Sequence, residues 1–331
     1  MRAFLLFLFF LVSVPASFAE QRCDVHVAAQ RAELGNLSLV YQSVGAPRDP
    51  ALLLVMGLGG QLIHWPDDVV EALCRQGFRV IRYDNRDVGL SRWNQLPPFG
   101  QSDCRAAALQ AGFASRRAVY VDRHGRGWAA PDGLTGHRPI PCAGCQHGGM
   151  IAQHLAAMAP ERVRSLTLVM SSSGAAGLPA PDPALVQLLA RRSAPNREVA
   201  IEQQADLLAA LGSPEVHDDR AVLMQQAAVA YDRAFNPEGA KRQIMAILAE
   251  PSRVALLNQL RVPTLVVHGT ADPLLPVMHG VHLAAHIQGS QLRLIPGLAH
   301  RFQEPFKAPL LGAVLPYLQS HRQDATHIAG L

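Results

Sequence analysis

After its first twenty residues, this 331-residue sequence lacks any apolar stretch long enough to cross a membrane. Charged residues are also scarce, at 17% of the chain, whereas 49% of the residues are hydrophobic. This composition excludes an intrinsically disordered chain and is typical of a globular protein. The length fits one large domain, or one domain that carries an insertion.

A basic surplus spread over the whole chain is missing as well. The net charge is +4, but residues 98–147 alone hold six arginines against three aspartates, and Arg2 lies in the leader described below. The remaining sequence has no net charge, so its composition gives no argument for a surface that binds nucleic acid. We expect no nucleic-acid partner.

The first nineteen residues have the order of a secretory signal peptide. Arg2 precedes an apolar run over Ala3–Val14, and Ser17 and Ala19 are small residues at the two positions that a signal peptidase reads. Cleavage before Glu20 predicts a secreted or periplasmic protein without a stable membrane span. An uncleaved anchor is the alternative.

Cysteine is rare, and the five cysteines form no repeated metal-binding pattern. In an exported chain Cys23 and Cys74 could form a disulfide or remain free thiols. Cys142 and Cys145 form one C-x-x-C pair, which is a weak signal for a redox or zinc site when no second pair accompanies it. We expect no metal and no cofactor.

Short apolar strands alternate with helices from residue 37 onward. The expected strands are 37–44, 51–56, 78–83, 165–170, 264–268 and 292–295, and the expected helices begin at 66 or cover 150–159 and 305–319. Repeated strand–helix alternation predicts an α/β fold with a mostly parallel sheet and helices on both faces.

Between residues 177 and 251 only helical periodicity remains, which predicts an inserted helical cap or a longer helical part of the same domain. The expected organisation is a signal peptide over 1–19, the first part of the core over 20–176, the cap over 177–251 and the second part of the core over 252–331.

Two turns after predicted strands carry the residues of acid–base chemistry. Asp272 follows the strand at 264–268, where a carboxylate can orient a histidine. His300 follows the strand at 292–295, where it can act as a general base. The charged turn that begins at Asp84 is more typical of a brace between loops.

The position of the nucleophile is the anomaly. Gly144–Gly148 has the spacing of G-x-S-x-G, but Gln146 stands where the serine is expected. A primary amide cannot be deprotonated to attack a carbonyl. The glycine-rich turn Met56–Gly60 could still present a backbone N–H to an oxyanion, because glycine permits close approach.

These motifs resemble the α/β-hydrolase family, especially its aclacinomycin-methylesterase and proline-iminopeptidase-like branch. The similarity runs through LLLVMGLGGQLIHWPDDVVEAL, FRVIRYDNRDVGLSRW, GGMIAQHLAAMAPERVRSLTLVMSSSG, VPTLVVHGTADPLLPVMHG and LIPGLAH. The resemblance implies Asp272 and His300 as triad acid and base, and oxyanion donors from the N–H groups of Leu58 and His147. It implies hydrolysis of a small-molecule carboxylic ester through an acyl-enzyme, with no cofactor. Proline-iminopeptidase-like amide hydrolysis and a non-catalytic ligand-binding pseudoenzyme are the alternatives.

Residues 98–147 depart from the family pattern. They contain two leucines, one isoleucine, no lysine and no glutamate, and no helical or strand period persists in them. The possible codons of residues 136–147 can be read in a frame that starts one base later. In that frame they permit Gly-Ile-Asp-Arg-Ser-His-Val-Leu-Gly-Ala-Ser-Met, which has serine in place of Gln146. A helix entry typical of the family appears in the same frame at 118–125. We therefore interpret 98–147 as frameshifted, and expect it to be poorly ordered and this chain to be inactive.

In this interpretation Cys142 and Cys145 are by-products of the shifted frame. Cys145 is disfavoured as a displaced nucleophile, because it lies one residue before the apex of the turn. A dehalogenase or an epoxide hydrolase would need an aspartate at the apex, whereas the shifted codon permits serine or asparagine.

Overall fold

The computed structural model describes residues 23–34, 37–93, 139–192, 194, 196–250 and 252–322. The predicted signal peptide lies outside the described residues, as do residues 94–138, which are most of the segment interpreted as frameshifted.

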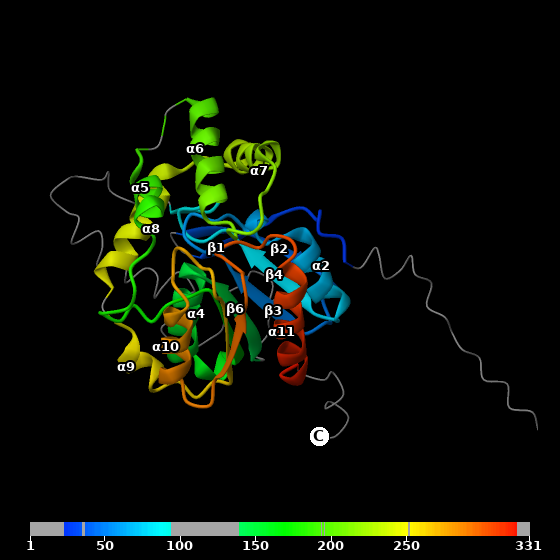
Figure 1. Cartoon of the computed structure of the whole chain (residues 1–331). Coiled ribbons are helices and arrows are strands. Elements are labelled where there is room, and N and C mark those ends of the chain that lie inside the picture. Colours follow the sequence, from blue (N-terminus) through cyan, green and yellow to red (C-terminus); the bar gives the residue numbers. More distant parts are fainter. Residues whose placement is uncertain are drawn as a thin grey trace, which may run out of the picture.

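A single sheet organises the described part of the chain (Figure 1). The strands run in the order β1-β2-β4-β3-β6-β7-β8-β9, and β5 pairs with β2 outside this order. β2 is antiparallel to its neighbours, whereas the pairs from β4 to β9 are parallel. The bounds are β1 Gln30–Leu34, β2 Leu37–Val44, β3 Ala51–Val55, β4 Arg79–Tyr83, β5 Arg92–Trp93, β6 Ile140–Cys145, β7 Val163–Val169, β8 Thr264–Gly269 and β9 Gln291–Ile295.

Helices cover both faces of the sheet, each burying an apolar face against it. α2 (Asp67–Arg75) and α11 (Lys307–Ser320) contribute to the core on one face. α4 (His147–Met158), α9 (Val254–Leu257) and α10 (Met278–His286) contribute to the core on the other. The predicted α/β architecture, a mostly parallel sheet between two helical layers, is confirmed.

Strand β6 lies in the middle of the sheet, between β3 and β7. Its residues are all buried and pair in parallel with both neighbours. The expectation that all of 98–147 is poorly ordered therefore does not hold for residues 140–147, which form β6, its turn and the start of α4. Pro141, which cannot donate a ladder hydrogen bond, lies at a register irregularity. Two neighbouring strands thus stabilise a segment whose own strand propensity is low.

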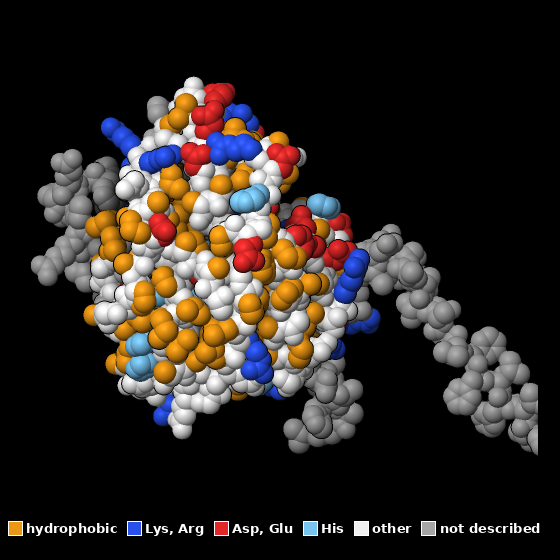
Figure 2. All heavy atoms as spheres, in the orientation of Figure 1, with side chains coloured by type: hydrophobic (Ala, Val, Ile, Leu, Met, Phe, Trp, Pro, Cys, Tyr) orange, Lys and Arg blue, Asp and Glu red, His pale blue; other side chains and the backbone are white. Residues whose placement is uncertain are grey.

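Four helices follow β7 and lie together beyond one end of the sheet (Figure 1). This helical segment consists of α5 (Pro183–Ala190), α6 (Arg197–Ala210), α7 (Arg220–Arg233) and α8 (Pro237–Ala249). Each helix begins after a residue whose side-chain oxygen accepts a backbone N–H of the first turn, namely Asp182, Asn196, Asp219 and Asn236. These caps explain where the helices start. Figure 2 shows acidic and basic side chains close together over this part, in keeping with ion pairs such as Arg220–Asp206.

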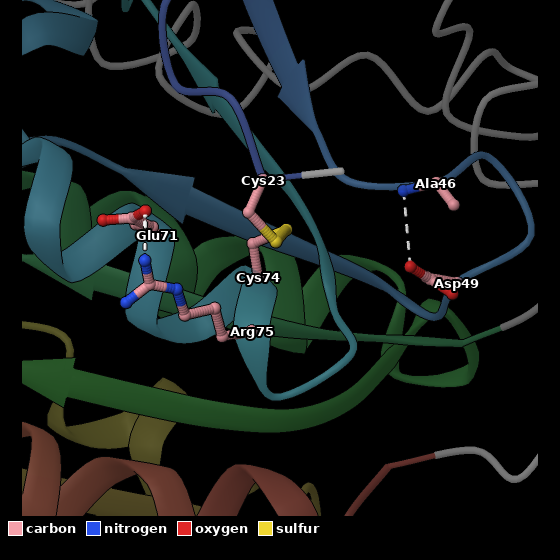
Figure 3. Close-up of a disulfide and its surroundings, with 6 residues drawn as sticks. All are labelled: Cys23, Ala46, Asp49, Glu71, Cys74 and Arg75. Carbon is pink, nitrogen blue, oxygen red and sulfur yellow. Dashed lines mark hydrogen bonds and ion pairs between the residues drawn. A yellow bond between two sulfur atoms is a disulfide. The ribbon is translucent and has the colours of Figure 1, made fainter. Parts of the chain in front are cut away.

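A disulfide ties the beginning of the described chain to α2 (Figure 3). Cys23 and Cys74 are joined, with their Cα atoms 5.7 Å apart, and both are buried. This settles the alternative that the sequence left open. Cys142 and Cys145 are free and buried in β6. Within the described ranges, no helix has both the length and the apolar character that a membrane span requires.

Candidate active site

A sharp turn joins β6 to α4. Its apex is Gln146, whose φ of 50° lies in the left-handed region that residues with a side chain rarely adopt. The packing around this turn requires glycine: a Cβ on Gly148 would lie 2.1 Å from the carbonyl oxygen of Val55. A Cβ on Gly144 would lie 2.4 Å from the carbonyl oxygen of Gly148. A strained strand-to-helix turn of this kind is the backbone geometry that presents a nucleophile.

The side chain of Gln146 contacts the glycine-rich turn that follows β3. Its Oε1 accepts a hydrogen bond from the N–H of Leu58 at 2.7 Å. Its backbone N–H donates to the carbonyl of Val169 at 2.9 Å, and its carbonyl accepts from Oγ of Ser171 at 2.7 Å. The residue is only 8% exposed. One of the two predicted oxyanion donors therefore binds the side-chain amide of the residue at the nucleophile position.

The structure brings Asp272 and His300 together, with 2.7 Å between Oδ2 and Nδ1. The carboxylate is buried, and its Oδ1 accepts from the N–H groups of Leu274 and Leu275 at 2.9 and 2.8 Å. Burial by itself would raise the pKa of Asp272, but the charge of His300 and hydrogen bonds from His268, His300 and Leu275 hold that pKa well below its usual range. An ionised Asp272 favours the His300 tautomer that donates from Nδ1, which leaves Nε2 free to accept a proton.

A second histidine contacts the same carboxylate. Nε2 of His268 lies 3.4 Å from Oδ2 of Asp272 and 2.7 Å from the carbonyl oxygen of Leu275. His268 is fully buried near the end of β8. Sequence reasoning missed this residue. The signal that could have found it is its position four residues before Asp272, at the end of a buried strand.

The loop that carries His300 rests on the helical segment. The backbone N–H of His300 donates to the carbonyl of Leu211 at 3.0 Å, just after α6. The N–H of Ala299 donates to Oγ of Ser213, also at 3.0 Å. The helical segment therefore helps to position the histidine.

The helical segment also holds the glycine-rich turn. The N–H of Gly59 donates to Oε1 of Gln243 at 2.8 Å. Nε2 of Gln61 donates to the carbonyl of Ala230 at 2.7 Å, and Nη1 of Arg233 donates to Oε1 of Gln61 at 2.6 Å. Helices α7 and α8 thus help to set the position of the backbone N–H that faces Gln146.

A buried ion pair extends these contacts to the turn after β4. The side chain of Asp84 has no exposed surface and accepts from the N–H groups of Leu62 and Leu90 at 2.7 and 2.8 Å. Nη2 of Arg233, whose side chain is 17% exposed, lies 2.9 Å from Oδ2 of Asp84. We refer to Asp84, Gln61, Arg233 and Gln243 as the clamp.

His147, the residue predicted to supply the second oxyanion donor, begins α4. Its ring is buried, and within the described residues Nδ1 has no hydrogen-bond partner. Burial, reinforced by the charge of Arg253, lowers the pKa of His147 to about 4, so the ring is neutral near pH 7. Its backbone N–H belongs to the first helical turn, where amides have no acceptor within the helix. Its role as a donor stays a prediction.

The two thiols of β6 are poorly suited to nucleophilic chemistry. Burial raises the pKa of Cys142 to about 12, and burial together with the charge of Asp272 raises the pKa of Cys145 well above its usual range. Both thiols therefore stay protonated, and the thiolate is the reactive form. In the part of the chain that the structure describes, no group of three or more His, Cys, Asp or Glu side chains could hold a metal ion.

Comparison with known proteins places this geometry in context. A family model described as the alpha/beta hydrolase fold matches residues 50–305. Rhodomycin D methylesterase DnrP of Streptomyces peucetius is 26% identical over 305 residues, which cover 86% of this chain and 96% of that protein. Rhodomycin D methylesterase DauP of Streptomyces sp. strain C5 is 27% identical over 314 residues, with the same two coverages.

A solved structure gives the same fold. The 2-hydroxy-6-oxo-6-phenylhexa-2,4-dienoate hydrolase of Rhodococcus sp. strain RHA1 superposes with a TM-score of 0.67 at 21% identity, and the match covers 90% of this chain and 99% of that one. At this level of identity the likeness concerns the fold alone.

Proposed function

This chain belongs to the α/β-hydrolase family, in its aclacinomycin-methylesterase-like branch, and from this premise we propose that its site is built to hydrolyse small-molecule carboxylic esters through an acyl-enzyme. The observation that carries the proposal is the pairing of Asp272 with His300 at 2.7 Å, together with a strained turn whose apex contacts the N–H of Leu58. The two rhodomycin D methylesterases support an ester as the substrate class.

The proposed chemistry assigns one role to each group. Nε2 of His300 takes the proton of a serine hydroxyl at the apex, while Asp272 holds the ring and stabilises its protonated form. The N–H groups of Leu58 and His147 stabilise the oxyanion, and loss of one such donor typically costs about 10²–10³ in rate. Water then releases the acid from the acyl-enzyme.

We propose that this exact chain does not complete the first step. Gln146 has no hydroxyl or thiol to deprotonate, and loss of the nucleophile costs roughly 10⁶ in serine proteases. Its Oε1 also occupies the N–H of Leu58, so a substrate oxygen would have to displace it. Both effects act against turnover.

A frameshift remains our explanation for Gln146. In the shifted frame the strand positions of Pro141, Cys142 and Ala143 become His, Val and Leu, and Gln146 becomes Ser. These residues suit a central strand better than proline and cysteine do. Nucleotide sequence over codons 90–150 tests this: an insertion with a compensating deletion is expected, and an uninterrupted frame would reject it.

Replacement of Gln146 by serine tests the proposed function. We expect no hydrolysis of a short-chain p-nitrophenyl ester by the unmodified chain, and measurable hydrolysis by Gln146→Ser. Gln146→Ala is the matched control, since it frees the N–H of Leu58 without supplying a hydroxyl. Adding His300→Ala to Gln146→Ser should abolish the gain.

Two results would count against the proposal. A folded Gln146→Ser protein that is as inactive as Gln146→Ala would reject the assigned roles. Turnover by the unmodified chain that disappears in His300→Ala would reject the predicted inactivity.

Non-catalytic ligand binding is a second candidate, favoured by one observation. Strand β6 and its turn are complete, and Gln146 is already held by Leu58, Val169 and Ser171. A binding site can therefore exist without turnover. Saturable binding of the same ester to the unmodified chain, measured calorimetrically with no product formed, would support this candidate.

We also propose that the chain is exported to the periplasm or the medium. The joined cysteines, Cys23 and Cys74, support this, because disulfides persist in oxidising compartments. Cell fractionation with N-terminal sequencing tests it. A mature protein that begins at Glu20 is expected, and a cytoplasmic protein that retains Met1 would contradict it.

A further inference from the structure

The side-chain amide of Gln146 is held as a substrate carbonyl would be. Its Oε1 lies 2.7 Å from the N–H of Leu58, the donor assigned above to the oxyanion. Asp272 and His300 follow β8 and β9, and Gln146 follows β6, so all three stand at the carboxyl end of parallel strands in one sheet. The polarised amide and the base therefore stand at the same edge of the sheet.

We propose that Gln146 is a self-deamidation site, at which the chain hydrolyses its own side-chain amide to glutamate. The inference rests on the roles that the proposed function gives to Leu58 and His300. It differs from that function in needing no side-chain nucleophile, because water attacks the amide directly.

The reaction balances with water as the only co-reactant. Nε2 of His300 takes a proton from a water molecule as the water oxygen bonds to Cδ of Gln146. The electron pair of the carbonyl moves to Oε1, where the N–H of Leu58 stabilises the negative charge. The electron pair on Oε1 then re-forms the carbonyl as the Cδ–Nε2 bond breaks, and the proton on His300 passes to the departing nitrogen. The products are glutamic acid at position 146 and ammonia, and transfer of the acid proton to ammonia leaves a glutamate carboxylate and an ammonium ion.

Two other glutamines of the described residues, Gln243 and Gln153, lack this combination and serve as internal standards. Oε1 of Gln243 also accepts a backbone N–H, that of Gly59 at 2.8 Å, but its Nε2 is bound to the carbonyl of Arg86 at 3.1 Å. Gln153 is fully buried, with Nε2 on the carbonyl of Ser172 at 3.1 Å and Oε1 on Arg253 at 2.9 Å. Like Gln146, Gln243 has a side-chain carbonyl polarised by a backbone N–H, and Gln153, like Gln146, is buried.

The experiment is peptide mapping by mass spectrometry of the purified full chain, incubated in water enriched in oxygen-18. We expect glutamate with one labelled oxygen at position 146, formed at least about 10²-fold faster than at Gln153 or Gln243. His300→Ala and His300→Gln should both reduce the rate at position 146 to that of the internal standards. The second variant keeps a polar side chain, in case the first fails to fold.

Three results would overturn the inference. Gln146 could persist as long as the two internal standards do. It could deamidate equally fast in the folded His300 variants, as in ordinary spontaneous deamidation. Glutamate could also form without taking up label from water. If Gln146→Ser hydrolyses the ester while Gln146 of the parent chain stays intact, only this inference is rejected. If Gln146→Ser is inactive, the proposed function is rejected.

Discussion

Replacing Arg233 by methionine tests how the clamp holds the helical segment to the core. The change keeps an apolar stem but removes the guanidinium from Asp84, whose side chain has no exposed surface. Removing one partner of a buried ion pair typically costs about 3–5 kcal/mol, because the other charge stays buried. Two backbone N–H groups, those of Leu62 and Leu90, still bind the carboxylate. We therefore expect the free energy of unfolding to fall by an amount near the lower end of this range, about 3 kcal/mol.

Equilibrium unfolding in urea measures this loss. The midpoint should fall while the slope m stays constant, since the surface exposed on unfolding is unchanged. Arg197→Met is the matched control: Arg197 pairs with Asp232 at 2.6 Å, but the two side chains are 44% and 55% exposed, so little change is expected. Adding Asp84→Asn to Arg233→Met should recover part of the loss, because it removes the uncompensated charge.

Equal losses in Arg233→Met and Arg197→Met would refute this reasoning. A second readout is available in the Gln146→Ser background. Arg233 also binds Gln61, next to the glycine-rich turn. Under the proposed function, Arg233→Met should therefore lower kcat in this background, at most by the roughly 10²–10³-fold that loss of one oxyanion donor costs. An unchanged kcat would mean that the core alone positions this turn.

Three further outcomes are expected. Folding lowers the pKa of Asp272, so the stability that its charge contributes is present above the pKa of the unfolded chain, about 3.9, and is lost as the pH falls. Below about pH 4, the urea midpoint of Asp272→Asn should therefore decline less steeply than that of the parent chain. Gly148→Ala should abolish folding, measured by circular dichroism, because its Cβ would lie 2.1 Å from the Val55 oxygen; a native thermal transition would contradict this. Reducing the Cys23–Cys74 disulfide, which spans a separation of 51 residues, should lower the free energy of unfolding by up to about 4 kcal/mol, with the Cys23→Ser, Cys74→Ser protein as control.

Much of the fold followed from local pattern. The strands at 37–44, 51–55 and 79–83 appear where continuous or alternating apolar residues predicted them. Helix α11 forms although Pro316 lies inside it, because its apolar face is buried against the sheet. Proline inside a helix lowers its propensity, and tertiary packing outweighs that cost here.

Strand β6 could not be predicted in the same way. Ile140–Cys145 contains proline, glycine and two cysteines, which gives little strand propensity and no alternation. It becomes a strand because β3 and β7 offer it a partner on each side, and a gap there would leave their backbone groups unpaired. Such pairing partners are distant in sequence, so no local window reveals them.

The contacts of the site divide along the same line. Asp272 and His300 were identified from their places after predicted strands, and Oδ2 of Asp272 lies 2.7 Å from Nδ1 of His300. The contact of Gln146 with Leu58, across 88 positions, and the place of His268 beside Asp272 were not foreseen. Side-chain hydrogen bonds between distant elements depend on rotamer and backbone position, which motif spacing does not specify.

By itself, the sequence determined the α/β class, the family resemblance and the residues predicted to act as acid and base, because periodicity and strand-end turns are local properties. Tertiary structure alone decided that β6 completes the sheet, that the helical segment holds the glycine-rich turn through Arg233 and Gln243, and that Gln146 occupies the N–H of Leu58. These outcomes depend on which distant groups come within hydrogen-bonding distance once the apolar faces are buried, and that distance exists only in the folded chain.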